Sequence, residues 1–152
     1  MPSSDPLLLD NQLCFSLYAT SLTLTQLYKP LLAPLGLTYP QYLVMLILWQ
    51  GDGLPLKAIA ERLGQKSGAL TPVIKRLAND GLVQRLRSSN DERNLEIRLT
   101  ARGQQLRQQA LQVNACILRS CATDLAQLGQ LKLMLDTLRE RLLQANPDLL
   151  AQ

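Results

Sequence analysis

Three cysteines and four tyrosines are the side chains of this sequence best suited to chemistry, because histidine is absent altogether. That absence removes the commonest general base and metal ligand, and with it the Ser-His-Asp, Cys-His and HExxH types of active site. Cys14, Cys116 and Cys121 are odd in number and widely spaced. This fits neither the disulfide framework of a secreted protein nor a zinc site of paired thiolates. No metal or cofactor is therefore expected, and at least one thiol should be free when reduced.

A free cysteine reacts with an oxidant as the thiolate, whereas an unperturbed thiol, with a pKa of about 8.5, is mostly protonated near neutrality. A reactive cysteine in this chain needs neighbours that stabilise its anion, and histidine cannot be one of them. Tyr18 follows Cys14 by one helical turn and would share its face of a helix. The alternative is that Cys14 is a small buried hydrophobe, as free cysteines often are.

Length and composition predict a single domain with a packed core. The chain has 152 residues, of which 47% are hydrophobic and 18% charged. Its apolar stretches are too short or interrupted to cross a membrane. The first residues lack the basic flank and small-residue cleavage site of a secretory signal, so a cytoplasmic location is expected.

The positive charge is concentrated in the middle of the chain. Residues 57–98 hold nine Lys and Arg against five Asp and Glu, while the rest of the chain holds seven of each. A local basic excess is expected of a surface that meets phosphate, which raises the hypothesis of nucleic-acid binding.

Hydrophobic spacing predicts a mainly helical chain. Leucines at three-, four- and seven-residue intervals predict one long amphipathic helix over residues 9–35. Thr38 and Gln41 then have the form of a capping box, with a second, nearly all-apolar helix running to Gln50. A short helix over 56–63, a turn, and a helix capped by Ser67 and ending near residue 81 form a helix-turn-helix in outline.

Pro72 lies inside this last predicted helix. Either Thr71 is the true cap or the first turn is bent.

Period-two alternation over residues 82–87 and 95–99 then predicts a β-hairpin with a charged tip, which completes the order of a winged helix. Thr100 caps a helix to about residue 120, and a last helix follows from Asp124 to about Gln144. Leucines in this last helix repeat at coiled-coil spacing, which favours a dimer built by the two termini. The alternative is that these leucines fill an intramolecular core.

Four stretches carry a family resemblance: LDNQLCF at residues 9–15, LTYPQYL at 37–43, SGALTP at 67–72 and DER at 91–93. They are similar to the MarR superfamily of transcriptional regulators, and within it to the organic-hydroperoxide regulators of the OhrR type. The resemblance covers nearly the whole chain. The sequence departs from the family pattern just before Ser67, where Gly64, Gln65 and Lys66 replace an aromatic residue, leucine and aspartate. This difference bears on operator preference.

The resemblance implies one mainly α MarR-type domain over residues 1–152, with a small β-hairpin wing. Residues 9–35 and 101–145 would form the dimerisation helices, and residues 55–100 the winged helix-turn-helix. It further implies a repressor that leaves a pseudo-palindromic operator in double-stranded DNA when an organic hydroperoxide oxidises Cys14. An intersubunit disulfide to Cys121 would follow, with Cys116 as the competitor for that role. Hydrogen bonds from Tyr28 and Tyr39, with Tyr18 as a further neighbour, would stabilise the thiolate.

In a winged helix-turn-helix the second helix enters the major groove and the wing reaches toward the minor groove. Asp91 would orient Arg93. The expected DNA contacts are Ser67, Thr71, Lys75 and Arg76 on the helix, and Arg85, Arg87, Ser89, Asp91 and Arg93 on the wing.

Three other functions compete with this one. The nearest is a MarR-type regulator controlled by a non-covalent phenolic ligand, with Cys14 incidental. A thiol peroxidase would need a thioredoxin-like βαβ pattern, which the sequence lacks, so no enzyme is expected. A helical adaptor without DNA function is disfavoured by the wing motif.

Overall fold

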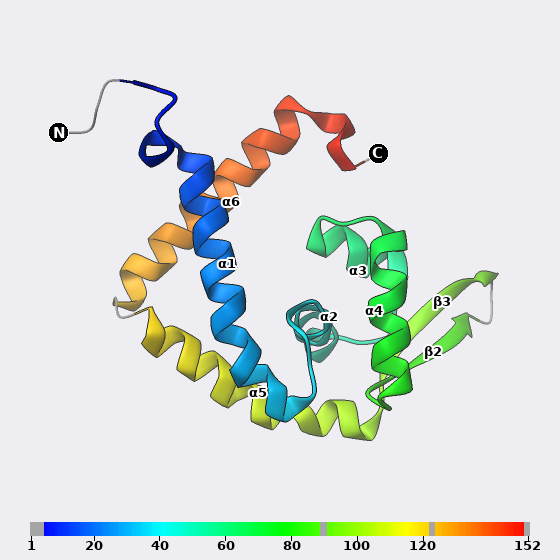
Figure 1. Ribbon diagram of the computed structural model, residues 1–152. Coiled ribbons are helices and arrows are strands. Elements are labelled where there is room, and N and C mark those ends of the chain that lie inside the picture. The colour runs from blue at the N-terminus through cyan, green and yellow to red at the C-terminus, as the bar shows by residue number, and fades with distance from the viewer. Residues whose placement is uncertain (1–4, 89–90, 122–123, 151–152) are drawn as a thin grey trace.

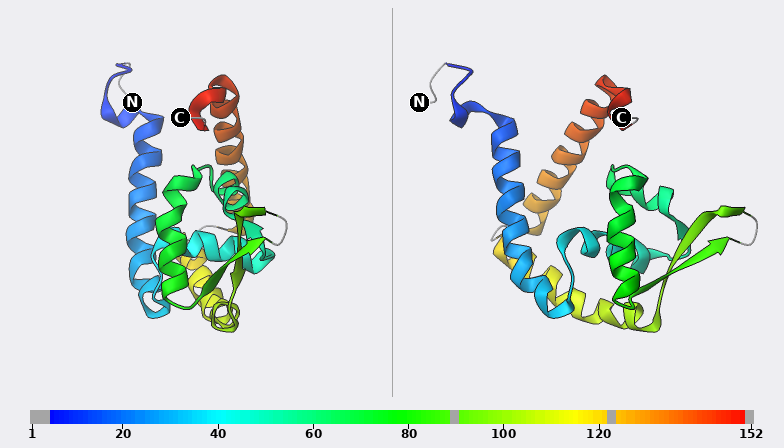
Figure 2. Two further views of the ribbon diagram at one scale, coloured as in Figure 1. Left: turned by 90° about the vertical axis from the view of Figure 1, so that its right-hand side faces the viewer. Right: turned by 45° about the vertical axis from the view of Figure 1, so that its right-hand side comes forward.

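A computed structural model describes residues 5–88, 91–121 and 124–150 of the chain. Two segments, α2 and α5, hold it together: Figures 1 and 2 show α2 in the middle of the molecule and α5 along its lower edge, joining α1 and α6 to the sheet and α4. In chain order the elements are η1 Leu9–Asn11, α1 Leu13–Leu32, η2 Ala33–Leu35, α2 Tyr39–Gln50, β1 Leu54–Pro55, α3 Leu56–Leu63, α4 Ser67–Asn79, β2 Val83–Ser88, β3 Asp91–Leu99, α5 Ala101–Ser120, α6 Leu125–Ala145 and η3 Pro147–Leu150.

The helix predicted over residues 9–35 is divided into three pieces. Gln12 has extended backbone angles (φ −92°, ψ 113°), which separates η1 from α1. At the other end Pro34 lies in the 3-10 turn η2, where a proline cannot supply the amide that would continue an α-helix. Gly36 then turns the chain with a left-handed φ of 71°. Spacing alone does not register these breaks, because apolar residues continue across them.

The capping box predicted before α2 is present. The backbone amide of Gln41 donates to the hydroxyl of Thr38 at 3.4 Å, and the amide of Thr38 donates to the Gln41 side chain at 2.9 Å. Val44, Met45 and Leu48 of α2 are fully buried. This helix is therefore the centre of the core, as its apolar sequence predicted.

The helix-turn-helix consists of α3 and α4. The predicted bounds of α3 are confirmed, but the predicted cap of α4 is one residue off: Ser67 is the first helical residue, and Lys66 holds the N-cap position without a side-chain bond. Thr71 is not a cap either, because α4 runs through Pro72. The Thr71 hydroxyl instead donates to the Ser67 carbonyl at 3.2 Å.

The wing is the antiparallel pair of β2 and β3, which projects away from the helices in Figures 1 and 2. The third strand, β1, pairs with β3 on its other side, giving the order β1-β3-β2. The sequence does not predict β1, because two residues are too few to show alternation. Gly53, the residue before β1, has a φ of 75°, and its amide donates to the Ile97 carbonyl at 2.8 Å.

Gly103 is the point at which α5 meets both α2 and the wing. Its carbonyl accepts a hydrogen bond from Nε1 of Trp49 at 2.9 Å, and its amide donates to the hydroxyl of Thr100 at 3.0 Å. A Cβ atom at residue 103 would overlap the backbone oxygen of Leu82, which already accepts from the Thr100 amide at 3.1 Å. Only glycine fits against this carbonyl.

The helices α1 and α6 expose much of their apolar surface. Leu32 is the one buried residue described in α1, and none of the described residues of α6 is buried. Exposed apolar side chains on these two helices are Leu13, Phe15, Leu22, Leu24, Leu125, Leu131, Leu133, Met134, Leu135 and Leu142. Among the described residues no single helix meets the length and hydropathy needed to cross a bilayer, although Leu13–Leu35 and Tyr39–Gln50, bent by 68°, do so as a pair.

Candidate functional site

Three tyrosines meet where α1 packs against the start of α2. The ring centroids of Tyr28 and Tyr39 are 4.7 Å apart, and the ring of Tyr42 is 5.6 Å from Tyr28 and 6.4 Å from Tyr39. The structure thus brings together the two tyrosines singled out in the sequence and adds Tyr42. The available signal for Tyr42 was its three-residue spacing from Tyr39, which places both on one helix face. We call these three residues the tyrosine cluster.

The phenols of the tyrosine cluster hold their protons tightly. Burial is the largest cause that raises the pKa of Tyr28 to about 12, followed by Tyr39, Tyr42 and Cys121. Burial likewise raises the pKa of Tyr39, and burial together with Tyr39 raises the pKa of Tyr42. These groups therefore remain neutral at physiological pH, and each keeps an O–H that can donate to an anion.

Cys121 is half-buried at the end of α5, close enough to Tyr28 to influence its pKa. Its backbone amide closes the last turn by donating to the Ile117 carbonyl at 3.2 Å. The side chain lines a cavity of about 340 Å³ beside the middle of α1. The other residues around this cavity are Ala19, Thr20, Thr23, Leu24, Leu27 and Ser120.

Cys14 lies apart from the tyrosine cluster. It is exposed near the start of α1, one turn before Tyr18, whose side chain is 65% exposed. With a rise of 1.5 Å per residue, the axis of α1 carries Cys14 about 21 Å from Tyr28 and about 14 Å from Thr23. Within one protomer Cys14 therefore does not reach the tyrosine cluster.

Cys116 is half-buried on α5 and is held by its own helix. The guanidinium of Arg119 donates to its sulfur at 3.1 Å. Cys121 and Cys116 thus differ in what their sulfurs face: the first borders a cavity, and the second has a partner from the same helix.

The outward face of α4 is basic. Leu70, Ile74 and Leu77 are buried against the core, while Lys75 and Arg76 are exposed on the opposite side. Ser67 and Thr71 are half-buried at the edge of this face. Lys66, Ala69 and Pro72 are also exposed on this surface, and the sequence had not singled them out as DNA contacts.

The wing adds the exposed side chains of Arg85 and Arg87 on β2. At the base of the wing, Arg98 pairs with Glu96 at 3.2 Å. The backbones of Asp91 and Arg93 belong to β3, whereas their side chains, like Ser89 as a whole, lie outside the described part of the chain.

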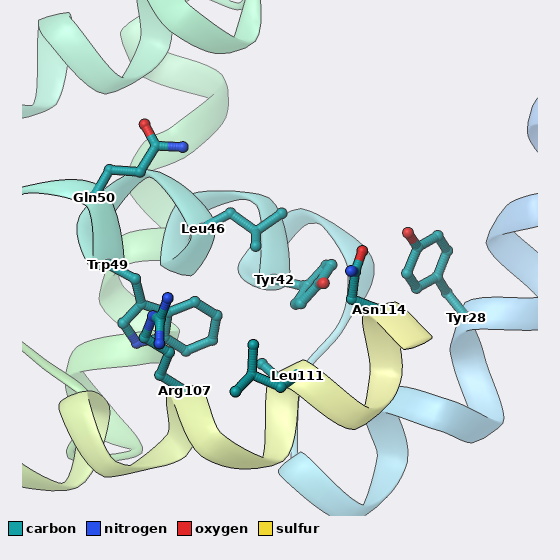
Figure 3. Close-up of a pocket in the computed structure, with 9 residues that line it drawn as sticks. Tyr28, Tyr42, Leu46, Trp49, Gln50, Arg107, Leu111 and Asn114 are labelled. Carbon is teal, nitrogen blue, oxygen red and sulfur yellow. The ribbon is translucent and has the colours of Figure 1, made fainter. Parts of the chain in front are cut away.

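A separate cavity of about 360 Å³ opens between α2 and α5. Figure 3 shows Tyr28, Tyr42 and Asn114 toward one end of it and Trp49, Gln50 and Arg107 toward the other. Its lining is a mixture of aromatic rings, apolar side chains and one guanidinium group.

These elements define a protein of the winged helix-turn-helix class, and comparisons with known proteins agree. Residues 26–110 match the family model described as "Transcriptional regulator SarA/Rot". An organic hydroperoxide resistance transcriptional regulator of Bacillus subtilis (strain 168) is 46% identical over 142 residues, which cover 93% of this chain and 97% of that protein.

Two solved structures of AbfR, a Staphylococcus epidermidis protein, are similar along most of the chain. Reduced AbfR bound to DNA has a TM-score of 0.77 at 38% identity, covering 90% of this chain and 94% of that one. Disulfide-formed AbfR has a TM-score of 0.61 at 39% identity, covering 90% and 91%. The chain belongs to the MarR superfamily of transcriptional regulators, in the branch that contains the organic-hydroperoxide regulators.

Proposed function

We propose that this protein is a cytoplasmic, dimeric repressor that binds a pseudo-palindromic operator when reduced and leaves it when an organic hydroperoxide oxidises Cys14. The main observation behind this proposal is that the site has two separate parts. The exposed thiol of Cys14 lies near one end of α1, and the tyrosine cluster lies near the other end with the thiol of Cys121 close to it. The resemblance to reduced, DNA-bound AbfR and to disulfide-formed AbfR supports this proposal. The protein acts by changing its affinity for DNA and is not an enzyme.

A second copy of the chain is the partner that this division requires. The exposed leucines of α1 and α6 supply an apolar surface that a dimer would bury. In the proposed dimer, an isologous pairing of residues 9–35 and 101–145 would bring Cys14 of one protomer to the tyrosine cluster of the other. Residues 55–100 then form the DNA-binding region of a single MarR-type domain.

The chemistry at Cys14 is a two-step oxidation. The thiolate attacks the hydrogen-bearing oxygen of the hydroperoxide, so that an S–O bond forms, the O–O bond breaks and a sulfenic acid results. The alkoxide that leaves takes a proton from water and becomes the alcohol. Hydrogen bonds from Tyr28 and Tyr39 of the other protomer, with Tyr18 alongside, stabilise the thiolate before attack. The thiol of Cys121 then attacks the sulfenic sulfur, forming the disulfide and releasing water.

Cys121 is the better candidate for this second step. The cavity beside it leaves space for an arriving side chain, whereas the sulfur of Cys116 has Arg119 as a partner. A disulfide needs Cα atoms within about 7 Å, so bringing Cys14 to Cys121 would move α5 and α6 and with them the DNA-binding region.

We expect Cys121→Ser to abolish the covalent dimer that peroxide produces and Cys116→Ser to leave it intact, because Cys121 lines a cavity whereas the Cys116 sulfur already has Arg119 as a partner. Non-reducing electrophoresis after treatment with cumene hydroperoxide measures this. A covalent dimer that persists in Cys121→Ser and vanishes in Cys116→Ser assigns the resolving role to Cys116 instead.

The DNA interface consists of the basic face of α4 and the wing. Lys75 and Arg76 of α4, with Ser67 and Thr71 at its edge, would enter the major groove. On the wing, Arg85, Arg87, Ser89 and Arg93 would contact phosphates or the minor groove, with Asp91 orienting Arg93.

To test the whole proposal, DNA duplexes are first selected from a random pool with the reduced protein, and the affinity of the protein for them is then measured. We expect the logarithm of affinity to fall linearly with the logarithm of salt concentration, with a slope of about −0.9 for each phosphate neutralised. We also expect cumene hydroperoxide to release the duplex and dithiothreitol to restore binding. A protein that selects no duplex, or that stays bound when fully oxidised, contradicts the proposal.

The cavity in Figure 3 favours a second candidate function, control by a non-covalent ligand. Its aromatic walls and Arg107 suit a small phenolic or aromatic acid. Ligand binding there would act without Cys14, which separates the two functions by experiment.

A further inference from the structure

The turn between α3 and α4 is contacted by a side chain from the C-terminal helix. The guanidinium of Arg139, in α6, lies over Gly64, where α3 ends. A Cβ atom at residue 64 would overlap Nη2 of Arg139 and would lie 3.3 Å from its Cζ. The guanidinium therefore occupies the space that any other side chain at residue 64 would need.

Gly64 suits this contact in two ways. Its φ of 65° is left-handed, and the amide of Gln65 donates to the Ala60 carbonyl at 3.0 Å, so residue 64 closes α3 in a Schellman-type turn. The end of a helix carries partial negative charge, which favours a nearby cation.

The contact joins the redox half of the molecule to the DNA-binding half. In Figures 1 and 2 the C-terminal end of α6 lies beside the turn between α3 and α4. Cys121 caps α5, and α6 begins at Leu125, fourteen positions before Arg139 or about 21 Å along the helix. None of the described residues of α6 is buried within its own subunit, so a shift at its first turn meets little resistance from that subunit's core.

We propose that Arg139 is a positioning residue that couples the state of Cys121 to the recognition helix. In the reduced protein its guanidinium fixes the α3–α4 turn, and hence the start of α4, in the DNA-binding arrangement. Formation of the Cys121 disulfide moves α6 and withdraws this group. The inference rests on the proposed function, because it describes how oxidation of that site would reach the operator.

Two substitutions remove the contact from opposite sides. Arg139→Ala deletes the guanidinium, and Gly64→Asn introduces a Cβ that excludes it while keeping a residue that tolerates left-handed backbone. We expect each to weaken operator binding by the reduced protein about fivefold or more. Each should also shrink, by the same factor, the ratio between the oxidised and reduced dissociation constants. The double variant should bind no more weakly than the weaker single one, since both remove one interaction.

Arg141→Ala is the matched control, because it removes the same charge from an exposed position two residues further along α6. Its affinity should equal that of the wild type. All variants should form the covalent dimer, and Arg139→Ala and Arg141→Ala should unfold at the wild-type temperature. The inference is overturned if Arg139→Ala binds like Arg141→Ala, if the two single effects add, or if the salt slope falls by about 0.9, which marks a direct phosphate contact. The affinities of the reduced variants test the role of Arg139 even if peroxide fails to release the wild type. That failure would contradict the proposed function and not the role of Arg139 in the reduced protein.

Discussion

Replacing Cys14 by serine leaves operator binding by the reduced protein intact and abolishes its release by organic hydroperoxide. A serine hydroxyl is nearly the size of a thiol but does not ionise near neutrality, so it forms neither a nucleophilic anion nor a sulfenic acid. We expect an affinity within about twofold of wild type, and no change under a peroxide dose that weakens the wild type about a hundredfold. Fluorescence anisotropy of a labelled operator measures both quantities.

Cys116→Ser is the control, because it removes a half-buried thiol of the same chain that already has a partner in Arg119. It should respond to peroxide like the wild type. Release of the Cys14→Ser variant by peroxide would remove the sensing role from this residue. If an aromatic acid releases both variants, Cys14→Ser and Cys116→Ser, from the operator and peroxide releases neither, control acts through the cavity in Figure 3.

Gly103→Ala is the substitution with the largest expected effect on stability. The new methyl group would overlap the backbone oxygen of Leu82 and would lie 3.3 Å from Cδ2 of Leu99. The oxygen cannot yield easily, because it accepts the Thr100 amide at the junction of the wing and α5. Forcing a methylene into a packed site costs about 1–3 kcal/mol, and we expect the upper end here. At about 2–4 °C per kcal/mol, the melting temperature should fall by roughly 6–12 °C, as calorimetry can show.

The comparison for this variant is Gly129→Ala, also a glycine within a long helix. A Cβ at residue 129 meets nothing within 4 Å. In a helix interior, alanine is favoured over glycine by about 0.5–1 kcal/mol, so this change should be neutral or stabilising. Equal melting temperatures for the two variants would show that the junction at Leu82 can relax.

Local patterns in the sequence specify most of the fold. The capping box at Thr38, the bounds of α3 and the alternating strands of the wing each depend on neighbouring residues, and each is present. What the sequence does not register depends on contacts between distant residues. The two-residue strand β1 exists because Leu54 pairs with Ile97, and glycine is required at residue 103 by a carbonyl twenty-one positions earlier in the chain.

In the candidate site, too, local sequence predicts some features, and others depend on contacts between distant residues. Cys14 and Tyr39 lie in recognisable motifs, and the clustering of Tyr28 with Tyr39 follows the packing of α1 on α2. The separation of about 21 Å between Cys14 and Tyr28 follows from the single helix predicted over residues 9–35, whereas the approach of Tyr42 to Tyr28 depends on how α1 packs against α2. The contact of Arg139 with the space over Gly64 is likewise not predictable from local sequence, since seventy-five residues separate the two in the chain.

The lack of buried residues in α6 bears on how the regulator behaves in the cell. A helix whose side chains find no core within their own subunit gains little from tertiary packing, so it depends on association for its persistence. Folding and assembly then form one equilibrium that shifts with dosage. For the proposed dimer we therefore expect a newly made copy to stay open to proteases until it meets another, and gene control to begin above a threshold of protein abundance.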